Sequence, residues 1–97
     1  MHLITRQKLK QFWEEHPDAK GALQSWAYEA EHANWTSPND IKKRYGSADP
    51  IGDNRVVFNI KGNDYRLIVK FEYKYQIAFI RFIGTHKEYD KINAETI

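Results

Sequence analysis

Residues 55–71 read RVVFNI-KGN-DYRLIVKF, two apolar runs on either side of a short polar segment. That segment, residues 61–63, contains the glycine and asparagine that tight hairpin turns favour. In the second run the odd-numbered residues from Tyr65 to Phe71 are all apolar, and Arg66 and Lys70 lie between them. This alternation is typical of a strand with one buried face. We therefore predict an antiparallel hairpin made of strands 55–60 and 64–71.

A third strand is predicted over residues 76–84, after a turn through residues 72–75. Its apolar character on both faces suits a covered, central position. Arg81 interrupts the row Ile77, Phe79 and Ile83, and must pair with a carboxylate or reach solvent. We expect helices on one face of the sheet and a basic surface on the other. The candidates for lining that surface are Arg55, Arg66, Lys70 and Arg81.

Helical patterns precede this sheet. Residues 1–5 form a short predicted strand, and Thr5 is the predicted cap of a first helix that ends before Pro17. A clean apolar stripe predicts a second helix over residues 19–33. Ser37 is the predicted cap of a third, over residues 38–45. Turn residues dominate from 46 to 54.

These elements define an α+β fold. Two to three helices pack on one face of a twisted, mainly antiparallel sheet, and a short helix follows the last strand. A chain of 97 residues corresponds to a single domain, 1–97.

Composition limits where the protein works and what it meets. It contains no cysteine, no 18-residue apolar run and no signal-peptide pattern at its start, so we expect a cytoplasmic protein that does not enter a membrane. The net charge is +2. However, residues 41–91 carry eleven Lys/Arg against six Asp/Glu, whereas residues 1–40 carry four against six. This asymmetry favours a polyanionic partner, although many small proteins have one basic face.

Residues 85–90 read THKEYD and follow the third strand directly. Thr85 and Glu88 have the spacing of a capping box, which predicts a helix start. His86 then lies in the first turn, with Tyr89 and Asp90 on its face. An imidazole next to a phenol and a carboxylate is suited to proton transfer. The alternative is a capped helix with polar surface residues and no catalytic role.

Several segments together resemble HigB-type toxins of bacterial toxin–antitoxin systems, within the broad RelE/ParE-like group. These segments are residues 2–5, 33–42, 52–60, 62–67 and 80–90, and the most specific piece is THKEYD at residues 85–90. The resemblance implies a ribosome-dependent endoribonuclease that cuts mRNA during translation. It also implies a HigA-like helix-turn-helix antitoxin, operator DNA bound only through the toxin–antitoxin complex, and no metal or organic cofactor.

Cleavage of RNA without a metal needs an acid, a base and cations at the phosphate. We hypothesise that His86 is the acid and that Tyr89 orients the phosphate or shares that role. Asp90 either orients His86 or forms a surface pair, and Arg66 and Arg81 stabilise the transition state. Contacts to flanking mRNA or ribosomal RNA are assigned to Arg55, Lys61, Lys70 and Lys87.

Two other functions fit the same group. Some ParE-type relatives inhibit a topoisomerase by protein contact, and a non-catalytic domain can block translation by occupying the ribosome. The fates of mRNA and of DNA topology distinguish these possibilities from the nuclease.

Overall fold

The computed structural model describes residues 1–97. The chain forms five strands, β1 (His2–Ile4), β2 (Asp49–Ile51), β3 (Arg55–Ile60), β4 (Tyr65–Glu72) and β5 (Ile77–Thr85). It also forms four α-helices, α1 (Gln7–Glu15), α2 (Lys20–His32), α3 (Pro38–Arg44) and α4 (His86–Tyr89), and a 3-10 turn over Pro17–Ala19. None of the helices is both long enough and apolar enough to cross a lipid bilayer.

The strands form one sheet in the order β1-β5-β4-β3-β2. The predicted meander of β3, β4 and β5 is confirmed, and β1 adds to β5 in parallel. The prediction of turns alone over residues 46–54 is wrong, because Asp49–Ile51 pairs with Val57–Arg55 as an edge strand. Pro50 is tolerated there, since an edge strand has one row of backbone groups that needs no partner.

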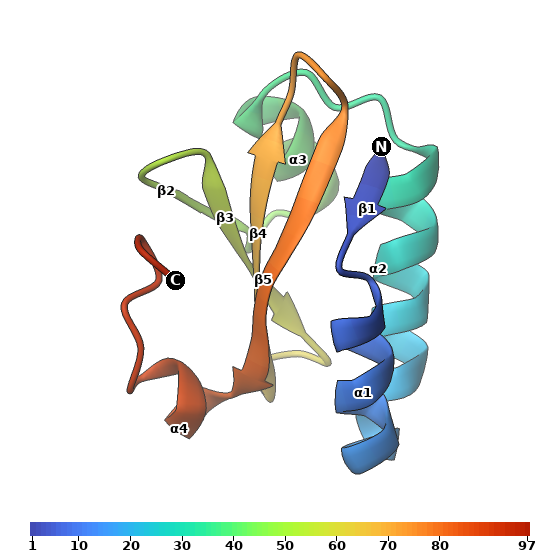
Figure 1. Ribbon diagram of the computed structural model, residues 1–97, viewed down its shortest axis with the longest axis vertical. Helices are drawn as coiled ribbons and strands as arrows, with labels where there is room; N and C mark the ends of the chain where they lie inside the picture. Colours follow the sequence, from blue (N-terminus) through green and yellow to red (C-terminus); the bar gives the residue numbers. More distant parts are fainter.

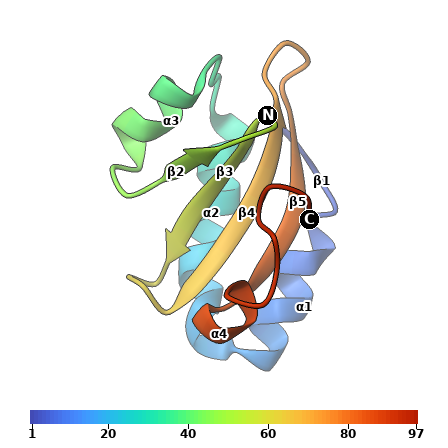
Figure 2. The same cartoon turned by 90° about the vertical axis from the view of Figure 1, so that its left-hand side faces the viewer.

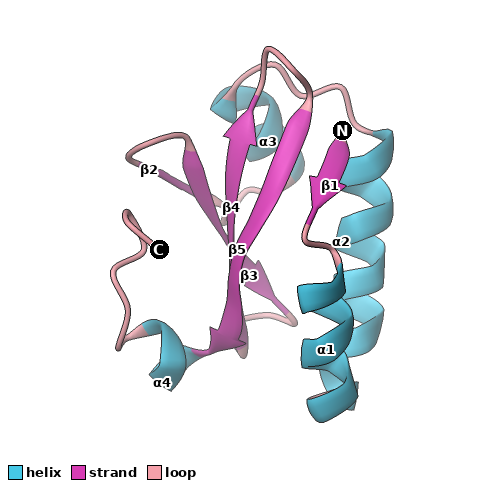
Figure 3. Cartoon of the chain, viewed as in Figure 1, coloured by secondary structure: helices cyan, strands magenta, loops and turns pink.

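Helices α1, α2 and α3 lie on one side of the sheet, and α4 with the residues after it lies on the other (Figures 1 and 3). The helix-covered face holds the core. The alternation read from β4 is confirmed: Tyr65, Leu67, Val69 and Phe71 are all buried in one cluster with residues of α1, α2 and α3. Burial of each large apolar side chain contributes about 1.5–3 kcal/mol to stability.

One predicted helix cap is wrong, and another is present without its side-chain bond. Thr5 has a left-handed backbone (φ 66°), and α1 starts after Arg6 without a side-chain cap. The chain must turn sharply there, because it leaves a strand held against β5 and enters a helix. Ser37 is the N-cap residue of α3, as predicted, but its side chain makes no capping bond. Instead, the Asp40 carboxylate accepts hydrogen bonds from the backbone N (3.0 Å) and hydroxyl (2.9 Å) of Thr36, which lower the pKa of Asp40.

A β-bulge interrupts β5 at Arg81. Val69 of β4 pairs with Ile80, but the preceding Ile68 pairs with Phe82, so Arg81 is the extra residue. Regular alternation would place Ile77, Phe79, Arg81 and Ile83 on one face of this strand. Because of the bulge, Ile83 lies on the other face from the rest. Ile83 packs against the core, whereas Arg81 reaches the opposite face of the sheet. Hereafter that opposite face is called the open face.

One polar cluster joins the helical layer to the sheet. The Asp18 carboxylate accepts hydrogen bonds from Lys61 Nζ (2.8 Å) and from the Tyr65 hydroxyl (2.7 Å). These bonds lower the pKa of Asp18, and Asp18 raises the pKa of both Lys61 and Tyr65. The cluster therefore links the 3-10 turn to the hairpin between β3 and β4.

Replacing Asp18 with asparagine is expected to lower the free energy of unfolding near neutral pH. The carboxylate has a depressed pKa in the folded state, so its contribution is present above the ordinary value of 3.8 and is lost as the pH falls through the folded-state pKa. The difference between wild type and Asp18→Asn should then shrink in acid. Urea unfolding between about pH 7 and about pH 2 measures it. Asp49→Asn, which removes an exposed carboxylate without a salt bridge, is the control, and an Asp18 effect that did not change with pH would contradict this account.

Candidate active site and nucleic-acid interface

The open face is built from alternate residues of three strands. The register aligns Asn59, Arg66 and Gly84 in one row, and Arg55, Lys70 and Phe79 in another, four residues along β4. Four residues of extended chain span about 13 Å. The predicted basic residues Arg55, Arg66, Lys70 and Arg81 therefore share this face, but they form two separate clusters.

Helix α4 stands at one end of the open face (Figure 2). The predicted capping box is confirmed: Glu88 N donates to Thr85 Oγ1 (3.2 Å) and Thr85 N donates to Glu88 Oε1 (2.8 Å). Gly84 is buried just before it, and a Cβ at this position would lie 2.6 Å from Phe82 Cζ. Glycine thus lets the Phe82 ring lie against the strand at the start of α4.

The first cluster joins β4 to α4. The Arg66 guanidinium carbon lies 5.9 Å from the centroid of the Tyr89 ring, and the Phe82 ring lies 6.4 Å from it. Arg66 Nη1 also donates to the main-chain oxygen of Asn63 (3.5 Å). A guanidinium beside a phenol and a second ring forms a surface suited to a phosphate and a stacked base.

His86 and Lys87 occupy the first two positions of α4. Both side chains are exposed and make no hydrogen bond within the protein. Asp90 follows α4 and is also exposed, and its carboxylate makes no hydrogen bond to His86. His86 and Lys87 are therefore open to an incoming ligand from solvent.

The second cluster contains Arg55, Lys70, Asp53 and Arg81. Asp53 Oδ2 accepts from Arg55 Nη1 (2.6 Å) and from Lys70 Nζ (3.3 Å), and these two cations lower its pKa. The main-chain oxygen of Ile97 accepts from Arg55 and from Arg81. Arg55 is consequently only 5% exposed, although it lies on the face without a helical layer.

Lys61 lies apart from both clusters. It sits in the hairpin between β3 and β4 and pairs with Asp18 at 2.8 Å, and with Asp64 at 3.8 Å. It is nearer to the α4 end of the sheet, because Ile60, Tyr65 and Thr85 are aligned there.

Phe79 and Phe82 are two half-buried rings of the open face that were not among the predicted site residues. Strict alternation from Ala78 and Ile80 would place Phe82 in the core. Only the bulge at Arg81 moves it to the other face. The sequence contains no signal for that bulge. No group of three or more His, Asp or Glu side chains is arranged to hold a metal ion.

Comparison with known proteins identifies the family. The model of a family described as HigB_toxin, the RelE-like toxic component of a toxin–antitoxin system, matches residues 19–92. The chain is similar to the mRNA interferase toxin HigB of Escherichia coli and to the mRNA interferase HigB of Shigella flexneri. Each is 33% identical over 96 residues, which cover 97% of this chain and 92% of the relative. The chain, with this fold and over nearly its full length, therefore belongs to the HigB family of RelE-like toxins.

Proposed function

We propose that this protein is the toxin of a toxin–antitoxin pair and an endoribonuclease that cleaves mRNA while ribosomes translate it. The observation that carries the proposal is the α4 end of the open face, where Arg66 lies beside Tyr89 and the His86 side chain is free. The names of the relatives, mRNA interferases, support RNA as the substrate.

The reaction begins with the 2′-hydroxyl beside the scissile phosphate. Its proton passes to a base, the 2′-oxygen attacks phosphorus, and the bond from phosphorus to the 5′-oxygen breaks. The products are a 2′,3′-cyclic phosphate and a 5′-hydroxyl, and the latter needs a proton from an acid. Charge on the phosphoryl oxygens rises in the transition state, so preplaced cations lower the barrier.

In this proposal His86 is the acid that protonates the 5′-oxygen. It stands on a helix fixed by the capping box and is accessible from solvent. Tyr89, three residues on, orients the phosphate or shares the proton transfer, and Asp90 either orients His86 from the same helical side or forms a surface pair. The proton acceptor is one of the basic groups around the site.

Arg66 stabilises the charge that develops on the scissile phosphate. Arg81, for which the same role was predicted, lies with Arg55 in the second cluster and contacts a neighbouring phosphate. Arg66 is held over the Tyr89 ring, which limits its side-chain freedom before substrate binds. Arginine suits the task because its planar fork can donate two parallel hydrogen bonds to one phosphate.

The RNA on either side of the scissile phosphate contacts the cations that have no assigned role in the reaction itself. Lys87 is unpaired, whereas Lys61, Lys70 and Arg55 each have a carboxylate partner and exchange it for a phosphate. Phe82 offers its ring to a base. The same proposal has four further parts. The ribosome completes the site, a HigA-like helix-turn-helix antitoxin neutralises the toxin, their complex binds operator DNA, and the protein acts in the cytoplasm.

Substitution of His86 with alanine is expected to reduce cleavage by roughly a hundredfold or more, because a positioned acid contributes about 10²–10⁴-fold. Primer extension on a translated reporter mRNA, in a cell-free translation system, measures it. His32→Ala on α2 is the matched control, since that side chain bonds the Tyr28 carbonyl (2.8 Å) far from the open face.

Discrete cuts in translated codons that persist in His86→Ala would remove His86 from the chemistry. Intact mRNA with halted translation would instead indicate ribosome occupancy. Intact mRNA with normal translation would contradict the nuclease and direct attention to DNA topology.

Arg66→Ala is expected to lower the cleavage rate by roughly a hundredfold to a thousandfold, because loss of one preorganised donor at a developing oxyanion has an effect of this size. Arg66→Lys should recover only part of the rate, because it restores the charge but not the planar fork. The same assay, at saturating ribosomes, measures both. Lys74→Ala, at the turn between β4 and β5, is the control for the loss of one positive charge. Equal rates in Arg66→Ala and wild type would exclude Arg66 from the site.

A further inference from the structure

The chain after α4 crosses the open face of its own sheet. We call residues 90–97 the tail. In Figure 2 it rises from α4 in front of β4 and β5, on the side opposite α1 and α2. Near its end Glu95 approaches the turn between β2 and β3, where a Cβ on Gly52 would lie 3.7 Å from Glu95 Oε2. The tail thus spans the face to which we assign RNA.

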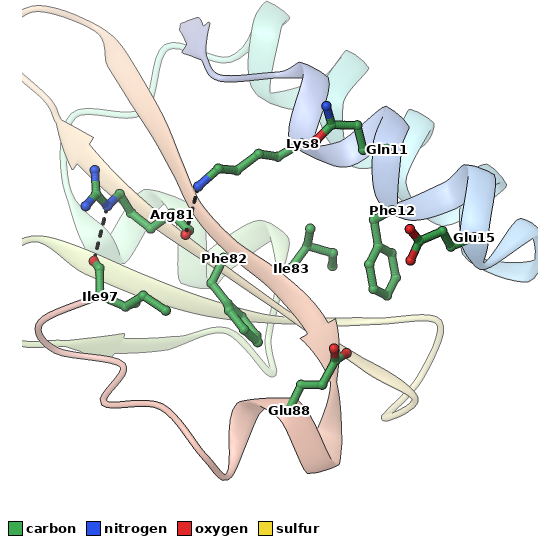
Figure 4. Close-up of a pocket in the computed structure, with 9 residues that line it drawn as sticks. All are labelled: Lys8, Gln11, Phe12, Glu15, Arg81, Phe82, Ile83, Glu88 and Ile97. Carbon is green, nitrogen blue, oxygen red and sulfur yellow. Dashed lines mark hydrogen bonds between the residues drawn. The ribbon is translucent and has the colours of Figure 1, made fainter.

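One main-chain oxygen anchors the tail. The oxygen of Ile97 accepts from Arg55 Nε (3.2 Å), Arg55 Nη2 (2.6 Å) and Arg81 Nε (3.1 Å). Ile97 and Phe82 line the same pocket, and Lys8 Nζ donates to the Arg81 carbonyl (3.5 Å) across it (Figure 4). Two guanidinium groups therefore converge on a single oxygen atom.

The rest of the tail is loosely held. None of its residues is buried, and its other hydrogen bonds are local, such as Ile97 N to the Asn93 carbonyl (3.0 Å) and Glu95 N to Asn93 Oδ1 (3.0 Å). Apart from the Ile97 oxygen it makes no hydrogen bond to the sheet. A segment with so few buried contacts can open locally at small cost in free energy.

Convergent guanidinium donors are the usual partners of phosphate oxygens and carboxylates. A phosphate presents several anionic oxygens to such donors. We propose that Arg55 and Arg81 form a subsite for a phosphate of single-stranded RNA, and that the tail fills this subsite until RNA displaces it. This inference rests on the proposed function, because it assigns a regulated substrate contact to the same face.

The tail then acts as a built-in competitor. The apparent affinity for RNA is the intrinsic affinity multiplied by the fraction of molecules with the tail released. A tail seated in about nine of ten molecules would weaken RNA binding about tenfold. Any partner that holds the tail away from Arg55 and Arg81 would strengthen it by the same factor.

A chain that lacks residues 93–97 tests the proposal directly. It keeps the bonds that finish α4, including Lys91 N to the Glu88 carbonyl and Ile92 N to the Tyr89 carbonyl. We expect it to bind an uncleavable 2′-O-methyl RNA oligonucleotide about tenfold more tightly than the full chain. Fluorescence anisotropy at fixed ionic strength measures this, since salt alone changes such affinities. In an Arg81→Ala background the gain should be smaller, because the anchor of the tail loses one of its three hydrogen bonds and Arg55 keeps the other two.

A reversible tether provides the second test. The natural chain has no cysteine, so Gly52→Cys with Glu95→Cys introduces the only pair. The oxidised form should bind the oligonucleotide more weakly than wild type, and reduction should restore the affinity. Either single-cysteine variant is the control for the substitutions themselves.

Equal affinities in the full, shortened, oxidised and reduced proteins would overturn the proposal. A shortened protein whose gain in affinity is the same with and without Arg81 would also overturn it, because the gain would then arise elsewhere. These readouts are independent of cleavage. If they follow expectation while translated mRNA stays intact, the subsite stands and the nuclease fails. If mRNA is cut while the tail has no effect on binding, the nuclease stands and the subsite fails.

Discussion

The pleat of β4, the central strand of the sheet, is the constraint on which the rest of the molecule depends. Side chains alternate along a strand, so Tyr65, Leu67, Val69 and Phe71 must all face one side once any of them does. Three helices cover that side, and the intervening Arg66 and Lys70 are left on the other. A shift of one residue would bury both cations, and unpaired buried charge is too costly for that register to compete. The position of the basic face is thus a by-product of core formation.

Two local devices turn this face into a site. The bulge at Arg81 brings consecutive residues, Arg81 and Phe82, to the open face, which a regular strand could not do. Gly84 then leaves room for the Phe82 ring, and the capping box starts α4 one residue later. These devices place a cation, a ring and the His86 side chain around the end of one strand. They add no large buried area, so they refine a surface whose stability comes from the core beneath it.

Most cations on the open face and in the adjoining hairpin already have a partner. Asp53 holds Arg55 and Lys70, Asp18 holds Lys61, and the Ile97 oxygen holds Arg55 and Arg81. Binding of a polyanion here is therefore an exchange of partners, and its net free energy is the difference between two sets of charge-assisted bonds. Such a surface favours ligands with closely spaced anionic oxygens over weakly charged ones. His86 and Lys87, which have no partner to exchange, are placed differently from the rest.

The sequence by itself determined the elements whose cause is local. The period-two pattern of residues 65–71, the turn at 61–63, the stripe of the second helix and the Thr85–Glu88 cap depend on near neighbours in the chain, and each is present in the structure. What needed the tertiary structure was decided by distant partners. Edge strand β2 exists because β3 offers it hydrogen bonds, Thr5 is not a cap because β1 is held by β5, and Phe82 changes face through a bulge. The contact of Ile97 with Arg55, 42 residues earlier, also belongs to this class, because no local pattern encodes where a polar tail meets a cation across the sheet.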